Sequence, residues 1–171
     1  MEFTVVTNLE GLRSLQEEWL RLQGDNDGRL FERWAWHYTW CEQRSRDQEN
    51  THALSLVVGR DKNETIAIVP LYKRSLFGPL RVKEFTCHRM SFSNDIVARS
   101  DIDEAYFLRI LQYLRESLGM LEILHLRHLD PRSRFTNYLV ENGYAEKQCA
   151  RLYVENDKDI SDQSARLSKS R

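Results

Sequence analysis

Apolar and polar positions along the chain predict short strands and helices in alternation. Residues 53–59 and 65–73 have strand character, and apolar side chains occupy both faces of the second segment, which predicts a central strand in a covered sheet. Only the short connection RDKN (60–63), followed by Glu64, separates the two segments. A parallel crossover needs a much longer connection, so we expect the two strands to pair antiparallel in one sheet. Pro70 qualifies this, because a proline cannot donate to the ladder and usually marks a bulge or an edge.

Further strands are predicted from shorter apolar runs: residues 3–7, 81–87, 91–98, 121–129 and 144–155. Three helices are predicted from apolar side chains at helical spacing, and their caps are Asn8 for the first, Ser100 or Asp101 for the second, and Asp130, with Gly143 just past the end, for the third. With the aromatic segment described next, the order is that of an α/β fold with a mixed, largely antiparallel sheet and helices on both faces. Residues 1–160 are expected to form one domain, and residues 161–171 to begin a linker helix.

The segment FERWAWHYTWCEQ (31–43) concentrates aromatic side chains. On a helix they divide between two nearly opposite stripes, Phe31, Trp34, Tyr38 and Cys41 on one and Trp36 and Trp40 on the other. A helix that is apolar on two sides is expected to be covered on two sides. We therefore expect Trp34 in the core, and at least one of Trp36 and Trp40 partly exposed or in contact with another chain.

Composition narrows the class of protein. The chain has 171 residues, 41% hydrophobic and 30% charged, with a formal net charge of −1. This is typical of a soluble globular protein and shows no electrostatic footprint for nucleic acid or an anionic membrane. No apolar run is long enough for a membrane span, and the N-terminus does not resemble a signal peptide. The three cysteines are odd in number and widely spaced, which favours free thiols in a reducing cytoplasm.

Few residues in the sequence are spaced as in a catalytic, metal-binding or phosphate-binding site. Cys87 and His88 are adjacent, and His125 and His128 are three apart, so on a strand each pair points to opposite faces and neither forms a nucleophile–base pair or a metal site. No phosphate-binding glycine loop is present. The basic pair Lys73–Arg74 is expected to be solvated, with a phosphate or carboxylate contact at Arg74 as the alternative.

The stretch HRMSFSND (88–95) is the most suggestive polar segment. One interpretation is a loop with a turn at Asn94–Asp95. The other is the polar wall of a pocket at the end of the sheet, in which His88, Asn94 and Asp95 meet a ligand. Asp95 precedes an apolar pair, where a carboxylate needs a partner or solvent.

Several motifs together resemble one family, the CelD-type acetyltransferases of cellulose and exopolysaccharide biosynthesis. These belong to the GNAT superfamily and are akin to FemAB-type aminoacyl transferases. The segment FSNDIV stands where that family has S-D-Y-x-D; Asp95 matches its last aspartate, and Phe92 replaces the first. The other motifs that carry the resemblance are L..L..EW..L (Leu12, Leu15, Glu18, Trp19, Leu22), F…W…W (Phe31, Trp36, Trp40), IAIVPL (66–71) and YLVENGY (138–144).

The resemblance implies that this chain is the N-terminal, substrate-side half of an acyltransferase. Members of the family are about twice as long, and their second half is the one assigned to acyl-CoA binding. Acetyl-CoA would then be a cofactor only with that half present, and none is expected in this chain. Trp36 and Trp40 would face the missing half, a second copy of the chain, or a small-molecule or sugar acceptor held between the halves.

Three functions remain open at this point. The first is the half enzyme, in which an acceptor amine or hydroxyl attacks an acyl thioester, with none of the catalytic groups in this chain. The second is a non-catalytic binding or assembly module of degenerate GNAT fold that docks a partner through its aromatic face. The third is an independent small enzyme with a pocket around residues 88–95.

Overall fold

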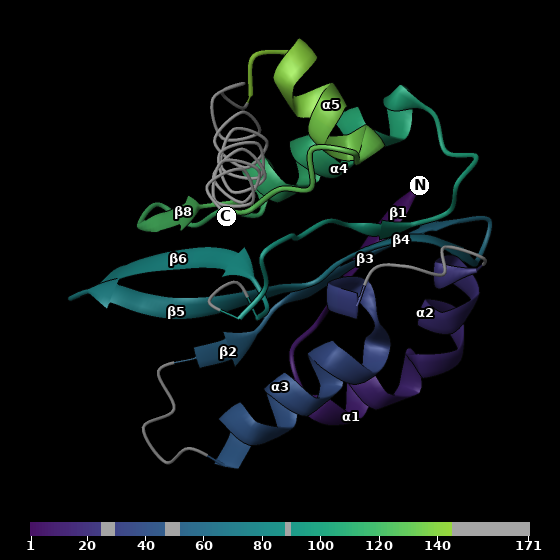
Figure 1. Cartoon of the computed structure of the whole chain (residues 1–171). Helices are drawn as coiled ribbons and strands as arrows, with labels where there is room; N and C mark the ends of the chain where they lie inside the picture. The colour runs from purple at the N-terminus through teal and green to yellow at the C-terminus, as the bar shows by residue number, and fades with distance from the viewer. Residues whose placement is uncertain (25–29, 47–51, 88–89, 145–171) are drawn as a thin grey trace, which may run out of the picture. The chain divides into compact units, whose positions relative to one another are not determined.

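The structure, a computed structural model, describes residues 1–24, 30–46, 52–87 and 90–144 (Figure 1). Within these residues it contains two compact units, Met1–His128 and the part that begins at Leu129. The helices of the first unit are α1 (Leu9–Ser14), α2 (Gln16–Gln23), the 3-10 turn η1 (Leu30–Glu32), α3 (Trp34–Arg46) and α4 (Glu104–Glu116). Its strands are β1 (Glu2–Val6), β2 (His52–Leu54), β3 (Leu56–Asp61), β4 (Glu64–Val69), β5 (Leu71–Phe77), β6 (Leu80–Phe85), β7 (Val97–Ala98) and β8 (Glu122–Leu124). The second unit contains α5 (Arg134–Glu141).

The strands of the first unit form two four-stranded sheets, so the predicted mixed, largely antiparallel α/β fold is confirmed. The first sheet has the order β1-β3-β4-β7, and all of its pairs are antiparallel. The second has the order β2-β5-β6-β8, in which β6 and β8 pair in parallel and the other pairs are antiparallel.

The predicted antiparallel hairpin is confirmed, but its place in a single sheet is not. Strand β3 pairs with β4 in the first sheet, whereas β2 pairs with β5 in the second. The change comes at Pro70, which has no N–H to donate and lies between β4 and β5. Opposite it, the N–H of Ser55 donates to the carbonyl of Leu71 at 2.9 Å, so pairing resumes at once in the second sheet. The tip of the hairpin is tighter than RDKN suggests, because only Lys62 and Asn63 form the turn, both with positive φ.

Helices cover both faces of the first sheet, as predicted. Leucines and Trp19 of α1 and α2 pack with Leu56, Val58 and Ile68 of the sheet in one buried cluster. On the other side lies α4, whose Tyr113 stacks on Phe3 of β1 with ring centroids 4.4 Å apart (Figure 1). Two of the predicted caps differ. Asn8 does cap the first helix, but Asp103 caps α4 and Ser133 caps α5. Each of these side chains accepts a hydrogen bond from the backbone N–H three residues on.

The aromatic helix α3 has one broad buried face, not two. The buried residues of α3 are Cys41, which belongs to the first predicted stripe, and His37, which lies between the two stripes. Trp34, Trp36 and Trp40 are all half-buried along the two flanks of this face. The prediction that Trp34 lies in the core is therefore wrong. The prediction that at least one of Trp36 and Trp40 is partly exposed is confirmed. A buried histidine at the centre of the face explains the error, since a hydrophobicity pattern counts it as polar.

Two predicted strands are much shorter than their sequence pattern. Of residues 91–98 only β7 remains a strand, and of residues 121–129 only β8. Outside these two strands, Asn94 of the first segment hydrogen-bonds to the backbone of Arg127 and His128 of the second, as described below. Residues 145–155 of the last predicted strand and the predicted linker helix (161–171) lie outside the described residues.

Candidate ligand-binding site

The strongest candidate site lies where the parallel strands β6 and β8 end. The register pairs Lys83 with Leu124, so Glu84 and His125 follow side by side at the carboxyl ends of their strands. The N–H of His125 still donates to the carbonyl of Lys83 at 2.9 Å, which extends the ladder by one residue. In open α/β sheets, ligands bind in crevices outside the carboxyl ends of parallel strands.

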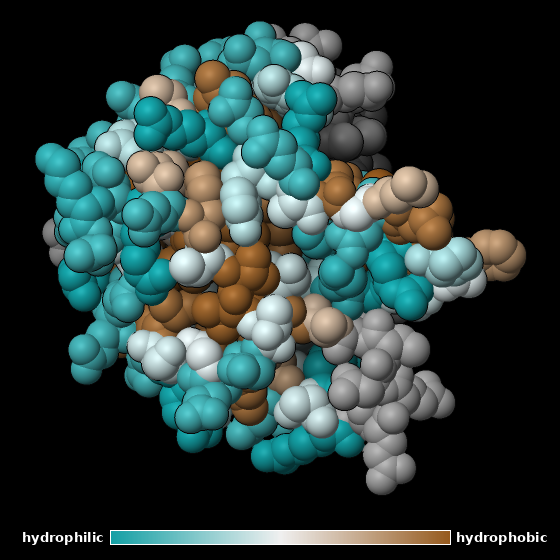
Figure 2. Space-filling model, turned by 180° about the vertical axis from the view of Figure 1, so that it is seen from behind, coloured by the Kyte–Doolittle hydropathy of each residue, from teal (hydrophilic) through white to brown (hydrophobic). Residues whose placement is uncertain are grey.

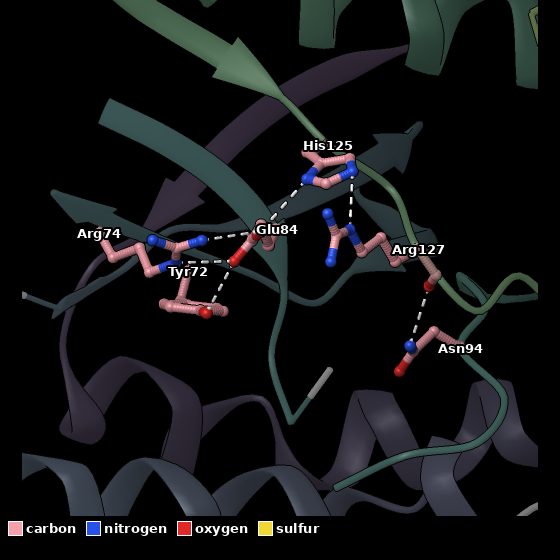
Figure 3. A network of polar contacts seen from close by, with 6 residues as sticks. All are labelled: Tyr72, Arg74, Glu84, Asn94, His125 and Arg127. Carbon is pink, nitrogen blue, oxygen red and sulfur yellow. Dashed lines mark hydrogen bonds and ion pairs between the residues drawn. The ribbon is translucent and has the colours of Figure 1, made fainter. Parts of the chain in front are cut away.

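Glu84 is the centre of a polar network (Figure 3). Its side chain is 2% exposed and accepts two hydrogen bonds from Arg74, from Nε at 2.9 Å and from Nη2 at 3.2 Å. The hydroxyl of Tyr72 donates to the same carboxylate at 2.9 Å. Burial first, and then this hydrogen bond, raise the pKa of Tyr72 above its ordinary value of 10, so the phenol stays protonated and remains a donor. The bidentate pair explains how a charged carboxylate is accommodated at a buried position.

His125 joins the network at its more exposed edge. Its Nδ1 lies 3.3 Å from Oε1 of Glu84, and its side chain is 40% exposed. The Nε of Arg127 donates to Nε2 of the same ring at 2.8 Å. A nitrogen that accepts a hydrogen bond carries no proton, so these contacts assign the neutral tautomer, with the proton on Nδ1 facing Glu84.

The segment that leaves β6 returns to close the crevice. The backbone N–H of Asn94 donates to the carbonyl of His128 at 2.6 Å, and its side-chain amide donates to the carbonyl of Arg127 at 3.0 Å (Figure 3). Cys87 and His128 adopt positive φ at the two ends of this enclosure, a conformation that costs a non-glycine residue energy and is concentrated at functional sites. The resulting open pocket has a volume of about 300 Å³, and its lining is Arg74, Glu84, Met90, Ser91, Phe92, Arg127 and His128.

A second, mostly apolar pocket adjoins the first. It has a volume of about 470 Å³ and is lined by Trp36, Trp40 and Arg44 among others, and by Met90, which also lines the polar pocket. Trp40 is held edge-on against Tyr72, with ring centroids 5.0 Å apart, and the guanidinium carbon of Arg44 lies 5.6 Å from the centre of its ring. An aromatic wall thus continues into the Glu84 network.

The structure brings together three of the six residues predicted to bind a substrate. Trp36 and Trp40 line the apolar pocket and Arg74 lines the polar one. Arg74 makes the carboxylate contact that was the alternative to a solvated pair, although the carboxylate belongs to this chain.

Asn94 and Asp95 are buried and bond to the chain's own backbone. Asn94 closes the crevice from behind, and Oδ1 of Asp95 accepts a hydrogen bond from the N–H of Ile96 at 2.8 Å. His88 lies outside the described residues.

Sequence reasoning missed Glu84, His125 and Arg127. Glu84 is the acidic residue of RVKEF, where alternation should have drawn attention to a carboxylate next to a buried phenylalanine. His125 and Arg127 are two apart in LHLRH, so they share a face of the strand.

The network combines groups that can bind a polar ligand and move a proton. The carboxylate of Glu84 orients the imidazole of His125, and Nε2 of that ring can accept a proton only when Arg127 no longer donates to it. Among the described residues, no group of histidine, cysteine and carboxylate side chains could hold a metal ion. Within the same residues, no helix is long and apolar enough to cross a membrane.

Comparison with known proteins finds similarity only to solved structures. No protein-family model matches the chain, and no curated protein matches it. A structure described as a probable acetyltransferase is similar over 86% of this chain and 91% of its own, at 13% identity and a TM-score of 0.47. A ribosomal-protein-alanine N-acetyltransferase from Brucella melitensis biovar Abortus 2308 is similar over 85% of this chain and 93% of its own, at 12% identity and a TM-score of 0.39.

Proposed function

We propose that this chain is the substrate-side half of a GNAT-type, acyl-CoA-dependent acyltransferase, and that it is inactive on its own. In this proposal the two adjoining pockets hold the acceptor, an amine or a hydroxyl compound such as a sugar. The acyl-CoA is bound by a second half, as in the CelD-type family that the sequence resembles. Trp36 and Trp40 supply the stacking surface, and Arg74 with Glu84 supplies the polar end.

One observation carries the proposal: an aromatic pocket shares Met90 with a polar pocket that Glu84 lines at the carboxyl ends of parallel strands. The buried carboxylate of Glu84 is paired with Arg74 and lies 3.3 Å from Nδ1 of His125. Sugar rings and aliphatic acceptors bind to flat aromatic surfaces, while a few fixed polar groups determine their orientation. The sequence after β6 lacks a glycine loop whose backbone N–H groups could hold a pyrophosphate, and this supports the proposal that a second half binds the acyl-CoA.

The reducing cytoplasm is the proposed location. Cys41 and Cys87 are both free and buried. Burial raises the pKa of Cys41 to about 12 and raises that of Cys87 as well, so both are inert structural thiols.

The alternative is a non-catalytic binding module, and surface apolarity favours it. Apolar residues gather in a patch on the face turned away from the viewer in Figure 1, as Figure 2 shows. Several large apolar side chains of the second sheet and its turns are exposed, namely Leu76, Phe77, Met120, Leu121 and Ile123. Such surfaces are typical of contacts with a partner protein.

Calorimetry separates the two functions. The purified chain is titrated with acetyl-CoA and, separately, with D-glucosamine as an acceptor probe. The half-enzyme proposal expects no micromolar binding of acetyl-CoA and saturable binding of the amine, lost in Trp40→Ala. Micromolar binding of acetyl-CoA would contradict the proposal and favour an independent enzyme. Binding of neither compound would favour the binding module.

A further inference from the structure

We propose that the polar pocket binds an oxyanionic group of the acceptor, a carboxylate or a phosphate, through Arg127, and that this binding uncovers Nε2 of His125. This inference deepens the proposed function and rests on it, since the ligand is the acceptor. It assigns Arg127 two alternative partners: the imidazole of His125, and an oxyanion when one is bound.

The polar pocket has an excess of positive charge. Of the described residues that line it, two carry a guanidinium group, Arg74 and Arg127, and one carries a carboxylate, Glu84. Glu84 is engaged in a bidentate pair with Arg74, which leaves that pair neutral overall. Among the described residues, no carboxylate forms an ion pair with Arg127, whose side chain instead donates to the neutral ring of His125. The pocket therefore carries an excess positive charge at Arg127, and a guanidinium fork matches the geometry of a carboxylate or a phosphate.

The same pocket is lined by Ser91, a buried serine whose hydroxyl can still donate a hydrogen bond. Ser91 is 5% exposed, and within the described part of the chain its Oγ has no hydrogen-bond partner. A buried hydroxyl without a partner is costly, so a ligand atom that accepts its hydrogen bond is stabilised. Ser91 and Arg127 line one pocket, and both offer donors, as an oxyanion requires.

The proton chemistry follows from the same contacts. While Arg127 donates to Nε2, the lone pair of that nitrogen is occupied. Once the guanidinium turns to the oxyanion, Nε2 is free to take a proton from the ammonium group of the acceptor. The ring then becomes an imidazolium stabilised by the carboxylate of Glu84, and the acceptor amine is left neutral with a free lone pair for attack on the acyl carbon. Only acceptors that carry both an amine and an oxyanion would meet both conditions.

Titration of the full chain with simple anions tests this inference without any acceptor. The probes are inorganic phosphate and sodium acetate, with sodium chloride at equal ionic strength to account for diffuse screening. The readout is the 15N spectrum of the imidazole of His125, assigned with a His125→Gln variant, because the Nε2 shift reports loss of the Arg127 hydrogen bond. Phosphate and acetate together distinguish the two sources of the oxyanion.

The expected result is a saturable change at Nε2 of His125 with phosphate, acetate or both, and none with chloride. Arg127→Gln should weaken anion binding by about tenfold or more, the effect of one charged hydrogen bond. The matched control, Arg109→Gln on the exposed face of α4, should bind as the wild type does. Absence of a saturable change, or equal binding by Arg127→Gln, would overturn the inference. Binding of D-glucosamine in the calorimetric test would still support the proposed function in that case, so the two can fail separately.

Discussion

Nδ1 of His125 lies 3.3 Å from Oε1 of Glu84, and the two side chains differ sharply in exposure, 40% for the histidine and 2% for the glutamate. The parallel pairing of β6 with β8 creates this relationship, since it aligns the two residues at the same end of the sheet. The buried carboxylate orients the ring, and the other ring nitrogen accepts a hydrogen bond from Arg127.

Replacement of Glu84 should be costly to stability. In Glu84→Gln the guanidinium of Arg74 and the hydroxyl of Tyr72 lose a shared charged acceptor, and we expect a loss of about 2–3 kcal/mol in the free energy of unfolding. Urea denaturation at neutral pH measures this loss.

The matched control is Glu64→Gln. Glu64 also pairs with an arginine, Arg99, but their side chains are 49% and 39% exposed. An exposed pair contributes little, so the control should lose less than about 1 kcal/mol. Equal losses in the two variants would show that the buried ion pair of Glu84 stabilises the fold no more than the exposed pair of Glu64.

Substitution of the half-buried tryptophans of α3 should destabilise the fold less than substitution of the fully buried Trp19. Trp36→Ala combined with Trp40→Ala should leave the chain folded, because both rings are half-buried at the flanks of the helix. If this flank is a contact with a second copy of the chain, light scattering should show less self-association in the double variant. Trp19→Ala is the contrasting variant, since that side chain is 0% exposed and its Nε1 donates to the carbonyl of Glu32 at 2.9 Å. We expect Trp19→Ala to lower the free energy of unfolding by about 3–5 kcal/mol. Outright unfolding of the double variant would place both rings in the core.

The sequence predicted most of the elements because hydrophobic periodicity depends on burial, and burial here follows the sheet and its covering helices. The buried residues Val58 and Ile68, for example, lie in the two segments (53–59 and 65–73) whose apolar pattern predicts strands of a covered sheet. Periodicity could not predict the break at Ser55, because that break depends on which strand supplies the next hydrogen bond across from Pro70.

The sequence predicted the apolar end of the candidate site, but only Arg74 of its polar end. Aromatic side chains cluster in sequence at Trp36 and Trp40, so they were visible to local pattern reasoning. Glu84 and His125 are far apart in the chain, and only the parallel register of β6 and β8 brings them together. A long-range pairing of this kind leaves no periodic trace in the sequence.

Stability should depend on pH through His37. This residue is buried on α3, its Nδ1 pairs with Oγ1 of Thr86 at 2.5 Å, and burial lowers its pKa to about 4. The unfolded chain titrates near the ordinary value of about 6.5, so between these values it binds a proton that the folded chain does not. The contribution is fully present above about pH 6.5 and falls as the pH drops towards 4.

Denaturation at two pH values measures this effect. From about pH 6.5 to about pH 5 the wild type should lose about 2 kcal/mol through His37. His37→Gln cannot titrate, so its stability should change less over the same interval. An equal pH dependence in the two proteins would assign the loss to other groups.

The central claim is that the pocket of Trp36 and Trp40, together with the adjoining Glu84 network, is where an acceptor binds. The most direct measurement follows the indole N–H signals of the 15N-labelled chain during titration with D-glucosamine, L-alanine and L-lysine. Trp19 and Trp34 serve as internal controls, since their indoles donate to backbone carbonyls of the chain itself. The account predicts that at least one of these amines shifts the signals of Trp36 and Trp40 saturably and leaves those of Trp19 and Trp34 in place. If none of the amines moves the signals of Trp36 and Trp40, or if all four indoles move alike, the claim is contradicted.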